Sequence, residues 1–324
     1  MSTGYSNQAT RIRMRIGDSW RDGQAFQDVR DPYRGDIVAQ APVSTPQDCE
    51  DALAAAYKAK KVMAAMPGFE RAALLRRAAD NVAARVDAIA RAMTLESGKA
   101  IRDSLIEVQR STDLLRLCAE EAVRIQGEHI PMDASAVGAG KIAMLMRYPV
   151  GVVAAITPFN GPVNLAAHKL GPALAAGNSF ILKPSPKAPL SVHLFIEAIL
   201  DAGVPDGAIN TLYGDAIGPQ MVSDSRVDFV SFTGSIPVGK IIRNTVGMKR
   251  VALALPLFIM TPITWLLPRS ARATRWRLPA RVVSRCRTSM CTNKFMTLLS
   301  RRSAARWTPS VLVIRWTWQP RLAP

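Results

Sequence analysis

The chain has 324 residues, of which 48% are hydrophobic and 21% are charged, a composition typical of a globular protein and not of a disordered or fibrous one. Its formal net charge of +17 is uneven, because residues 256–324 contain 12 Arg, 1 Lys and no acidic residue, whereas residues 1–255 carry 29 − 25 = +4. Most of the chain therefore lacks the basic excess typical of proteins that bind nucleic acid or membrane surfaces.

The cysteines and the N-terminal segment indicate a cytoplasmic protein. A chain of this length is not expected to depend on disulfides, and its cysteines lack metal-ligand spacing, so we expect no metal site and a reducing compartment. The N-terminal segment has no apolar signal-peptide core, since Asp18 and Arg21 interrupt it. The cysteines are Cys49, Cys118, Cys286 and Cys291.

The first part of the chain predicts a β hairpin followed by long helices. Residues 13–43 alternate short β-like runs with turn signals, which favours an antiparallel hairpin. Alanine-rich sequence from Thr45 to Met66 then predicts a helix, which Pro67-Gly68 ends. Residues 70–94 and 99–125 predict two further helices, whose apolar stripes would pack together as a helical layer.

The second part of the chain predicts a parallel sheet. Residues 141–150 resemble a strand, and from there strands and helices alternate with short loops. This alternation is typical of an α/β fold with a Rossmann-like, doubly wound parallel sheet. The strands are expected at residues 150–156, 179–183, 208–212 and 227–232, and the helices at 165–176, 190–202, 219–223 and 238–244.

The loops that follow these strands form a candidate ligand crevice, because open parallel sheets bind ligands at the carboxyl ends of their strands. Thr233-Gly234-Ser235 opens a helix, so its backbone N–H groups could bind phosphate, although an ordinary strand-to-helix turn has the same pattern. Lys183 would direct an ammonium group over the crevice or be a solvated lysine. Asn160 could donate to an oxyanion or form an Asx turn.

Several segments taken together resemble the aldehyde dehydrogenase superfamily. Their order and approximate spacing match over residues 20–253, and Glu96-Ser-Gly-Lys99 agrees with them. The resemblance therefore implies aldehyde oxidation and a site for NAD or NADP. The segments are Pro149-Val-Gly-Val-Val-Ala-Ala-Ile-Thr-Pro-Phe-Asn160, Lys169-Leu-Gly-Pro-Ala-Leu-Ala-Ala-Gly-Asn178, Leu182-Lys-Pro-Ser185, and Phe232-Thr-Gly-Ser235 with Gly239 following.

The resemblance also implies a role for each matching residue. Asn160 would be the amide of the oxyanion hole. The cofactor would contact Ile156, Thr157 and Pro158 on the nicotinamide side, Lys183 and Ser185 at the adenosine ribose, Gly214 and Gly218 beneath the adenine, and Phe232, Gly234 and Ser235 at the pyrophosphate.

Pro186 departs from the pattern of the family. Many members that prefer NAD carry Glu at this position, where it accepts hydrogen bonds from the ribose and repels a 2′-phosphate. Proline removes that charge, so NADP is not excluded, and Lys183 with Lys187 could favour it.

The sequence leaves the family pattern after Leu253. The expected Glu-Leu-Gly-Gly, whose Glu is the general base, is replaced by Ala254-Leu-Pro-Leu257. The nucleophilic cysteine is expected near Thr288, but the arginine-rich surroundings of Cys286 and Cys291 do not resemble its motif. We therefore interpret residues 1–255 as the cofactor-binding region, residues 256–324 as an aberrant basic tail rather than a native domain, and the catalytic domain as truncated.

A frameshift accounts for this tail. Codons for residues 279–283, re-read from their third nucleotides, can spell Gly, Gln, Gly or Ser, and Cys. The same shift can spell Val-Tyr-Val-His-Lys-Gln-Val-Tyr-Asp from residues 288–297, which resembles the family sequence after the cysteine. From residues 259–263 it can spell His-Asp-Ala-Asp, which resembles the acidic segment after Glu-Leu-Gly-Gly. We hypothesise a small deletion, natural or a sequencing error, at residues 254–256.

Three other readings of the chain stay open. The tail could bind single-stranded nucleic acid through its Arg and its five Trp residues, and residues 251–267 form an uncharged run that is marginal for a membrane span. Neither partner is expected, since the tail shows no repeating pattern and the run carries two prolines. The third reading, a cofactor-binding fragment without turnover, describes this polypeptide best. Intact relatives form homo-oligomers, with residues 141–150 resembling their pairing strand, but the truncation puts that assembly in doubt.

Overall fold

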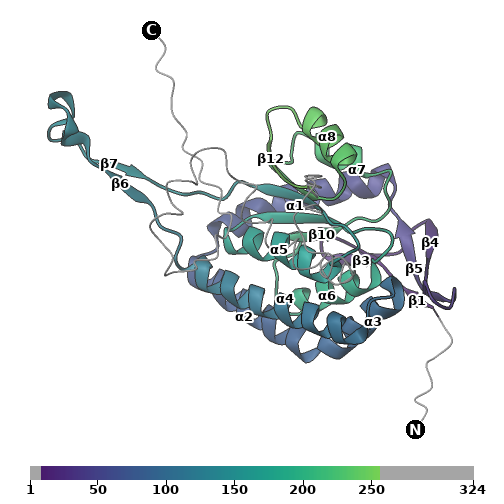
Figure 1. Cartoon of the computed structure of the whole chain (residues 1–324). Helices are drawn as coiled ribbons and strands as arrows, with labels where there is room; N and C mark the ends of the chain where they lie inside the picture. Colours follow the sequence, from purple (N-terminus) through teal and green to yellow (C-terminus); the bar gives the residue numbers. More distant parts are fainter. Residues whose placement is uncertain (1–8, 256–324) are drawn as a thin grey trace, which may run out of the picture. The chain divides into compact units, whose positions relative to one another are not determined.

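Five parallel strands form the central sheet in the computed structural model, which describes residues 9–255 (Figure 1). Their order across the sheet is β10-β9-β8-β11-β12. Every residue of β8, β9 and β10 is buried, as expected for a parallel sheet with both faces covered. The strands are β8 (Val152–Ile156), β9 (Ser179–Lys183), β10 (Ile209–Thr211), β11 (Phe229–Thr233) and β12 (Arg250–Ala254).

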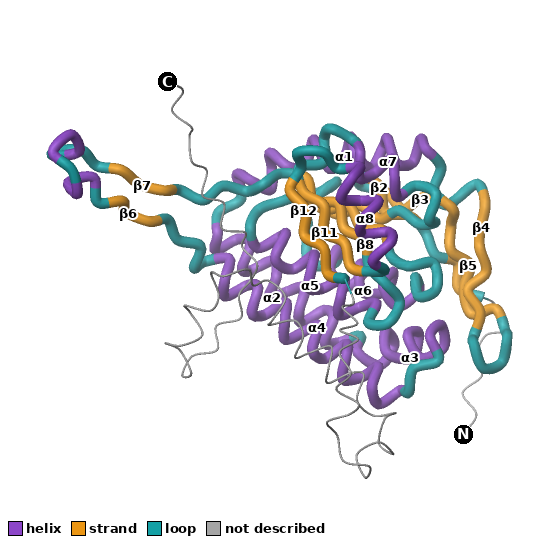
Figure 2. Tube along the Cα trace, turned by 45° about the horizontal axis from the view of Figure 1, so that its top comes forward, coloured by secondary structure: helices purple, strands orange, loops and turns teal. Residues whose placement is uncertain are grey.

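Helices cover both faces of this sheet and confirm the predicted doubly wound α/β fold. Helices α5 (Pro162–Ala175) and α6 (Leu190–Leu200) lie on one face, and α1 (Pro46–Ala65) packs against β8, β9 and β10 on the other (Figure 2). Helix α7 (Gly218–Ser223) contacts α1, β8 and α8 (Ile236–Thr245). The chain runs from β8 outward to β10 and returns to β11 on the other side of β8, so the topological switch point lies between β8 and β11.

The predicted helical layer is present, but its second helix is divided. Helices α2 (Gly68–Ala84) and α3 (Val86–Ser97) meet at Arg85, whose φ of −113° and ψ of 13° are not helical. The expectation of one helix over residues 70–94 is wrong. Both α2 and α3 pack on α4 (Ile101–Ala122) and α6, and α2 packs additionally on α5, so tertiary packing overrides the helical propensity at Arg85.

Short strands precede the helices and confirm an antiparallel pairing in residues 13–43. Strands β4 (Ala25–Arg30) and β5 (Ile37–Val43) pair in antiparallel fashion, and so do β2 (Met14–Ile16) and β3 (Ser19–Arg21). β1 (Thr10–Arg11) adds to β5 in parallel. The segment therefore forms two small sheets rather than one hairpin.

A second hairpin extends away from the helices and the central sheet (Figure 1). Strands β6 (Glu128–Ile130) and β7 (Ala143–Leu145) pair in antiparallel fashion, and two 3₁₀ turns, Met132–Ala134 and Ala136–Gly138, lie between them. The strand predicted over residues 141–150 is therefore present only in its central part.

The structure bears on only some expectations about partners. Within residues 9–255, every helix is too short or too polar to cross a lipid bilayer. No group of three or more His, Cys, Asp or Glu side chains in that same range is placed to bind a metal ion. The predictions for residues 256–324, including the frameshift and the basic tail, lie outside the described residues.

Candidate functional site

Three strand ends meet in register at the carboxyl edge of the sheet, beside the switch point. Ile156, the last residue of β8, is paired with Lys183 of β9 on one side and with Phe232 of β11 on the other. The sequence placed all three in the candidate site, and the sheet brings their backbones together. The loops that follow these strands therefore share one edge, as the topology of an open parallel sheet requires.

The first residue after β8 carries a buried hydroxyl group. The backbone N–H of Thr157 donates to the Lys183 carbonyl at 3.2 Å, which continues the ladder past the strand end. Thr157 is 3% exposed, and its Oγ1 has no hydrogen-bond partner among the described residues. Because an unsatisfied buried hydroxyl costs about 1–3 kcal/mol, this atom is well suited to bind a ligand or an ordered water molecule.

Lys183 is a buried cation at the end of β9. Its side chain is 6% exposed, and its Nζ lies 2.7 Å from Oδ1 of Asp215, in the loop after β10. Gly218 at the start of α7 lies against it, since a Cβ there would be 3.9 Å from the lysine Cε. Gly214 has a φ of +89°, a conformation that favours glycine. Lys183, Asp215 and Gly218 thus lie together, Gly214 directly precedes Asp215 in the chain, and Asp215 is a partner that sequence reasoning missed.

The loop after β9 is tied to the loop after β8 by a second lysine. The Nζ of Lys187 lies 4.8 Å from the centre of the Phe159 ring, within the range of a cation–π contact. The backbone N–H of Lys187 donates to Ser185 Oγ at 3.3 Å. Pro158, which lies between Thr157 and Phe159 in the chain, is half-buried.

The loop after β11 needs glycine for steric reasons. A Cβ at Gly234 would lie 2.5 Å from the Phe232 ring, closer than real Cβ contacts allow. The Gly234 N–H donates to the Ala254 carbonyl at 3.3 Å. Ser235 is exposed at the N-cap of α8 but makes no side-chain capping bond, so the first-turn N–H groups of this helix are not capped by a side chain. This end of α8 therefore offers donors for a phosphate group.

Asn160 is exposed just before the first turn of α5. Its side chain makes no hydrogen bond to another described residue, so the amide is not held in one orientation by the residues that the structure contains. The described contacts therefore do not tie Asn160 to the other residues predicted for the site.

Two buried carboxylates of the helical layer position the site loops. Glu96 at the end of α3 accepts hydrogen bonds from the backbone N–H groups of Leu190 at 2.6 Å and Ser191 at 3.0 Å, and from the Ser191 hydroxyl. It thereby caps α6, which has no side-chain N-cap of its own. Burial raises the pKa of Glu96 to about 7.

Glu107 of α4 caps the first turn of α5, as Glu96 caps that of α6. Its Oε1 accepts from the backbone N–H of Asn164 at 3.1 Å, and its other oxygen pairs with Lys99. Helix α5, which follows the Asn160 loop, likewise has no side-chain cap of its own. The sequence singled out the segment that contains Glu96 and Lys99, but nothing local to these residues reveals which distant backbone they cap.

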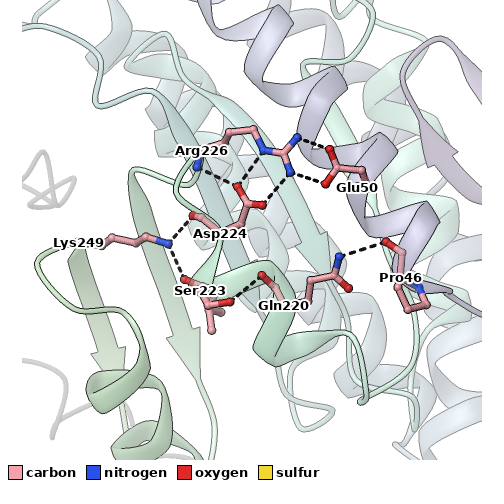
Figure 3. A network of polar contacts seen from close by, with 8 residues as sticks. Pro46, Glu50, Gln220, Ser223, Asp224, Arg226 and Lys249 are labelled. Atoms are coloured by element: carbon pink, nitrogen blue, oxygen red, sulfur yellow. Dashed lines mark hydrogen bonds and ion pairs between the residues drawn. The ribbon is translucent and has the colours of Figure 1, made fainter.

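A polar network fixes the opposite, amino-terminal edge of the sheet (Figure 3). Arg226 before β11 donates to both carboxylate oxygens of Glu50 on α1 at 2.6 Å each, and also to Asp224. Lys249 donates to the backbone carbonyls of Val222 and Asp224, which joins β12 to the same point. The network belongs to the scaffold and not to the candidate site.

The two described thiols do not suit nucleophilic chemistry. Cys49 and Cys118 are free and buried. Burial raises the pKa of each thiol to about 12, so neither supplies a thiolate near neutral pH.

Residues 20–256 match the aldehyde dehydrogenase family. The chain is 38% identical over 250 residues to a 3-sulfolactaldehyde dehydrogenase from Priestia aryabhattai, covering 76% of this chain and 52% of the relative. It is 34% identical over 243 residues to an NADP-dependent glyceraldehyde-3-phosphate dehydrogenase from Streptococcus equinus, covering 74% and 51%. A crystal structure of betaine aldehyde dehydrogenase from Staphylococcus aureus with NAD⁺ superposes with a TM-score of 0.72 at 30% identity, covering 75% of this chain and 49% of that one.

The chain spans about half the length of the curated relatives that it matches. Residues 20–256, which match the family, contain the five-stranded sheet and the loops at its carboxyl edge. The protein belongs to the aldehyde dehydrogenase family.

Proposed function

We propose that this chain binds NAD or NADP in the crevice at the carboxyl edge of β8, β9 and β11. The observation that supports this most directly is the register of Ile156 with Lys183 and Phe232, beside the unpartnered hydroxyl of Thr157. The Staphylococcus aureus relative is described in complex with NAD⁺, and the Streptococcus equinus relative as NADP-dependent. Both cofactors are therefore candidates for this chain.

The residues fit the cofactor part by part. We propose that α8 offers the N–H groups of its first turn and the Ser235 hydroxyl to the pyrophosphate, which the lack of a Cβ at Gly234 allows to approach closely. Lys183 and Ser185 would bind the adenosine ribose, and the adenine would lie against Gly214 and Gly218.

The nicotinamide end would lie at the β8 loop. We propose that it contacts Ile156, Thr157 and Pro158 and that the buried Thr157 hydroxyl finds a hydrogen-bond partner there. When bound, the cofactor supplies a hydride acceptor. Asn160 is available to donate its amide to an aldehyde oxygen, a type of contact worth about 3–4 kcal/mol in a transition state.

We propose that the chain binds the cofactor without oxidising an aldehyde to a carboxylic acid. A thiolate nucleophile is needed for the covalent step in this family's chemistry, and neither Cys49 nor Cys118 provides one. Cys286 and Cys291 lie outside the described residues, in a sequence context that we attribute to a frameshift. The two free, buried thiols are compatible with the cytoplasmic location that we propose.

Titration calorimetry of the full-length chain with NAD⁺ and NADP⁺ tests this proposal, together with a dehydrogenase assay on a panel of aldehydes. We expect binding at one site and no reduced cofactor. Lys183→Met should weaken binding, and Lys58→Met, a lysine on α1 away from this edge, should not. Absence of binding would refute the proposed site. Accumulation of NADH or NADPH, with stoichiometric labelling of Cys286 or Cys291 by an aldehyde-like electrophile, would refute the absence of turnover.

A further inference from the structure

The ion pair between Lys183 and Asp215 is asymmetric. The lysine side chain is 6% exposed and comes from a fully buried strand, whereas the aspartate side chain is 75% exposed on a loop. Their charged atoms are 2.7 Å apart. The buried ammonium is thus held by the strand, and the carboxylate that neutralises it is exposed to solvent on the loop after β10.

The second cation expected at this corner is also engaged. Lys187 lies over the Phe159 ring at 4.8 Å. The sequence did not exclude NADP, since Pro186 supplies no acid, and Lys183 with Lys187 could favour it. In the structure, one of these lysines is neutralised by Asp215 and the other is held by an aromatic ring. Asp215 therefore offsets the Lys183 charge that would attract a 2′-phosphate, and Lys187 keeps its charge beside the ring.

A ribose and a ribose 2′-phosphate place opposite demands on this corner. The vicinal hydroxyls of a ribose donate hydrogen bonds and suit a carboxylate acceptor, as in other doubly wound folds. A 2′-phosphate is an anion without such donors, and a carboxylate beside it is repulsive. The identity of the charge that faces the ribose therefore decides between the two cofactors.

We propose that Asp215 determines the cofactor specificity of this chain and makes it prefer NAD over NADP. It does so from the loop after β10 by accepting from the ribose hydroxyls and by neutralising Lys183. An acidic residue at position 186 is then not needed. This inference rests on the proposed function, and it names which of the two cofactors the same crevice binds more tightly.

The test compares the dissociation constants of NAD⁺ and NADP⁺ for four forms of the full-length chain: wild type, Asp215→Asn, Asp215→Glu and Asp206→Asn. Asp206 is a matched control because its side chain is 74% exposed and pairs with Arg15 at 3.2 Å. It precedes β10, so it lies at the amino-terminal ends of the strands and away from the candidate site. The thermal unfolding midpoint of each variant is recorded, and Asp215→Glu keeps the negative charge.

We expect wild type to bind NAD⁺ more tightly and Asp215→Asn to shift the ratio of the two constants toward NADP⁺ by at least about fivefold. Asp215→Glu and Asp206→Asn should keep the wild-type ratio. An unchanged ratio in Asp215→Asn, or an equal change in Asp206→Asn, would overturn the inference while leaving the proposed function intact. Failure of wild type to bind either nucleotide would overturn both.

Discussion

Replacement of Glu96 by glutamine tests how the helical layer holds the loop after β9. The Glu96 carboxylate is 4% exposed and accepts three hydrogen bonds at the start of α6, two from the backbone and one from Ser191. Glutamine has nearly the same shape and keeps one acceptor oxygen, but it cannot ionise. The variant therefore separates the charge of Glu96 from its packing.

The magnitude follows from the pKa of this carboxyl group. Burial raises it from 4.5 to about 7, against the hydrogen bonds of Ser191 and Leu190, which lower it. Since the folded-state pKa lies above the unfolded one, the native state binds the proton more tightly. Its contribution to stability is fully present below pH 4.5 and is lost as the pH rises through about 7, a total of about 3 kcal/mol.

Urea unfolding followed by circular dichroism measures this difference over a pH range from about 4.5 to about 8. As the pH rises across that range, the free energy of unfolding of Glu96→Gln should increase by about 3 kcal/mol relative to that of wild type. Glu120→Gln, an exposed glutamate on α4, should keep the wild-type dependence. Parallel pH curves for wild type and Glu96→Gln, or a variant that loses stability relative to wild type as the pH rises, would refute the reasoning.

Three further outcomes are expected. Gly234→Ala places a Cβ against the Phe232 ring and should weaken nucleotide binding by about tenfold, as calorimetry would show; unchanged affinity would contradict the steric argument. Arg226→Lys loses the paired hydrogen bonds to Glu50 and should lower the urea midpoint without changing nucleotide affinity, because the network lies at the other edge of the sheet. Burial lowers the pKa of His193 from 6.5 to about 4, so the stability that this neutral histidine contributes above pH 6.5 is lost as the pH falls toward 4. His193→Phe should therefore make the free energy of unfolding depend less on pH between 6.5 and 4, and an unchanged dependence in this range would contradict the argument.

The central strands were predictable because burial on both faces leaves a clear signature. β8 and the centre of β9 are short apolar runs close to glycine and proline, and their alternation with helices favours a covered parallel sheet. The break at Arg85 was not predictable, since alanine and arginine on both sides of it favour a helix, and the helices that α2 and α3 pack against come from later parts of the sequence. β12 was missed because the family pattern ends within its sequence.

The positions of candidate site residues in the fold were predictable only where they follow from a single strand end. Gly234 and Lys183 could be placed because each lies at the end of its own strand, which shares an edge with the others. Asp215 and Glu96 were missed as partners, because each acts on a residue from another element, and pairing at long range leaves no local pattern.

Hydrogen–deuterium exchange of the full-length chain, with and without saturating NAD⁺, tests the central claim that the carboxyl edge of the sheet binds the nucleotide. We predict added protection confined to peptides that cover residues 157–160, 184–187, 213–218 and 233–237. Protection limited to residues 256–324, or no change in any of these four loops despite measured binding, would contradict the claim.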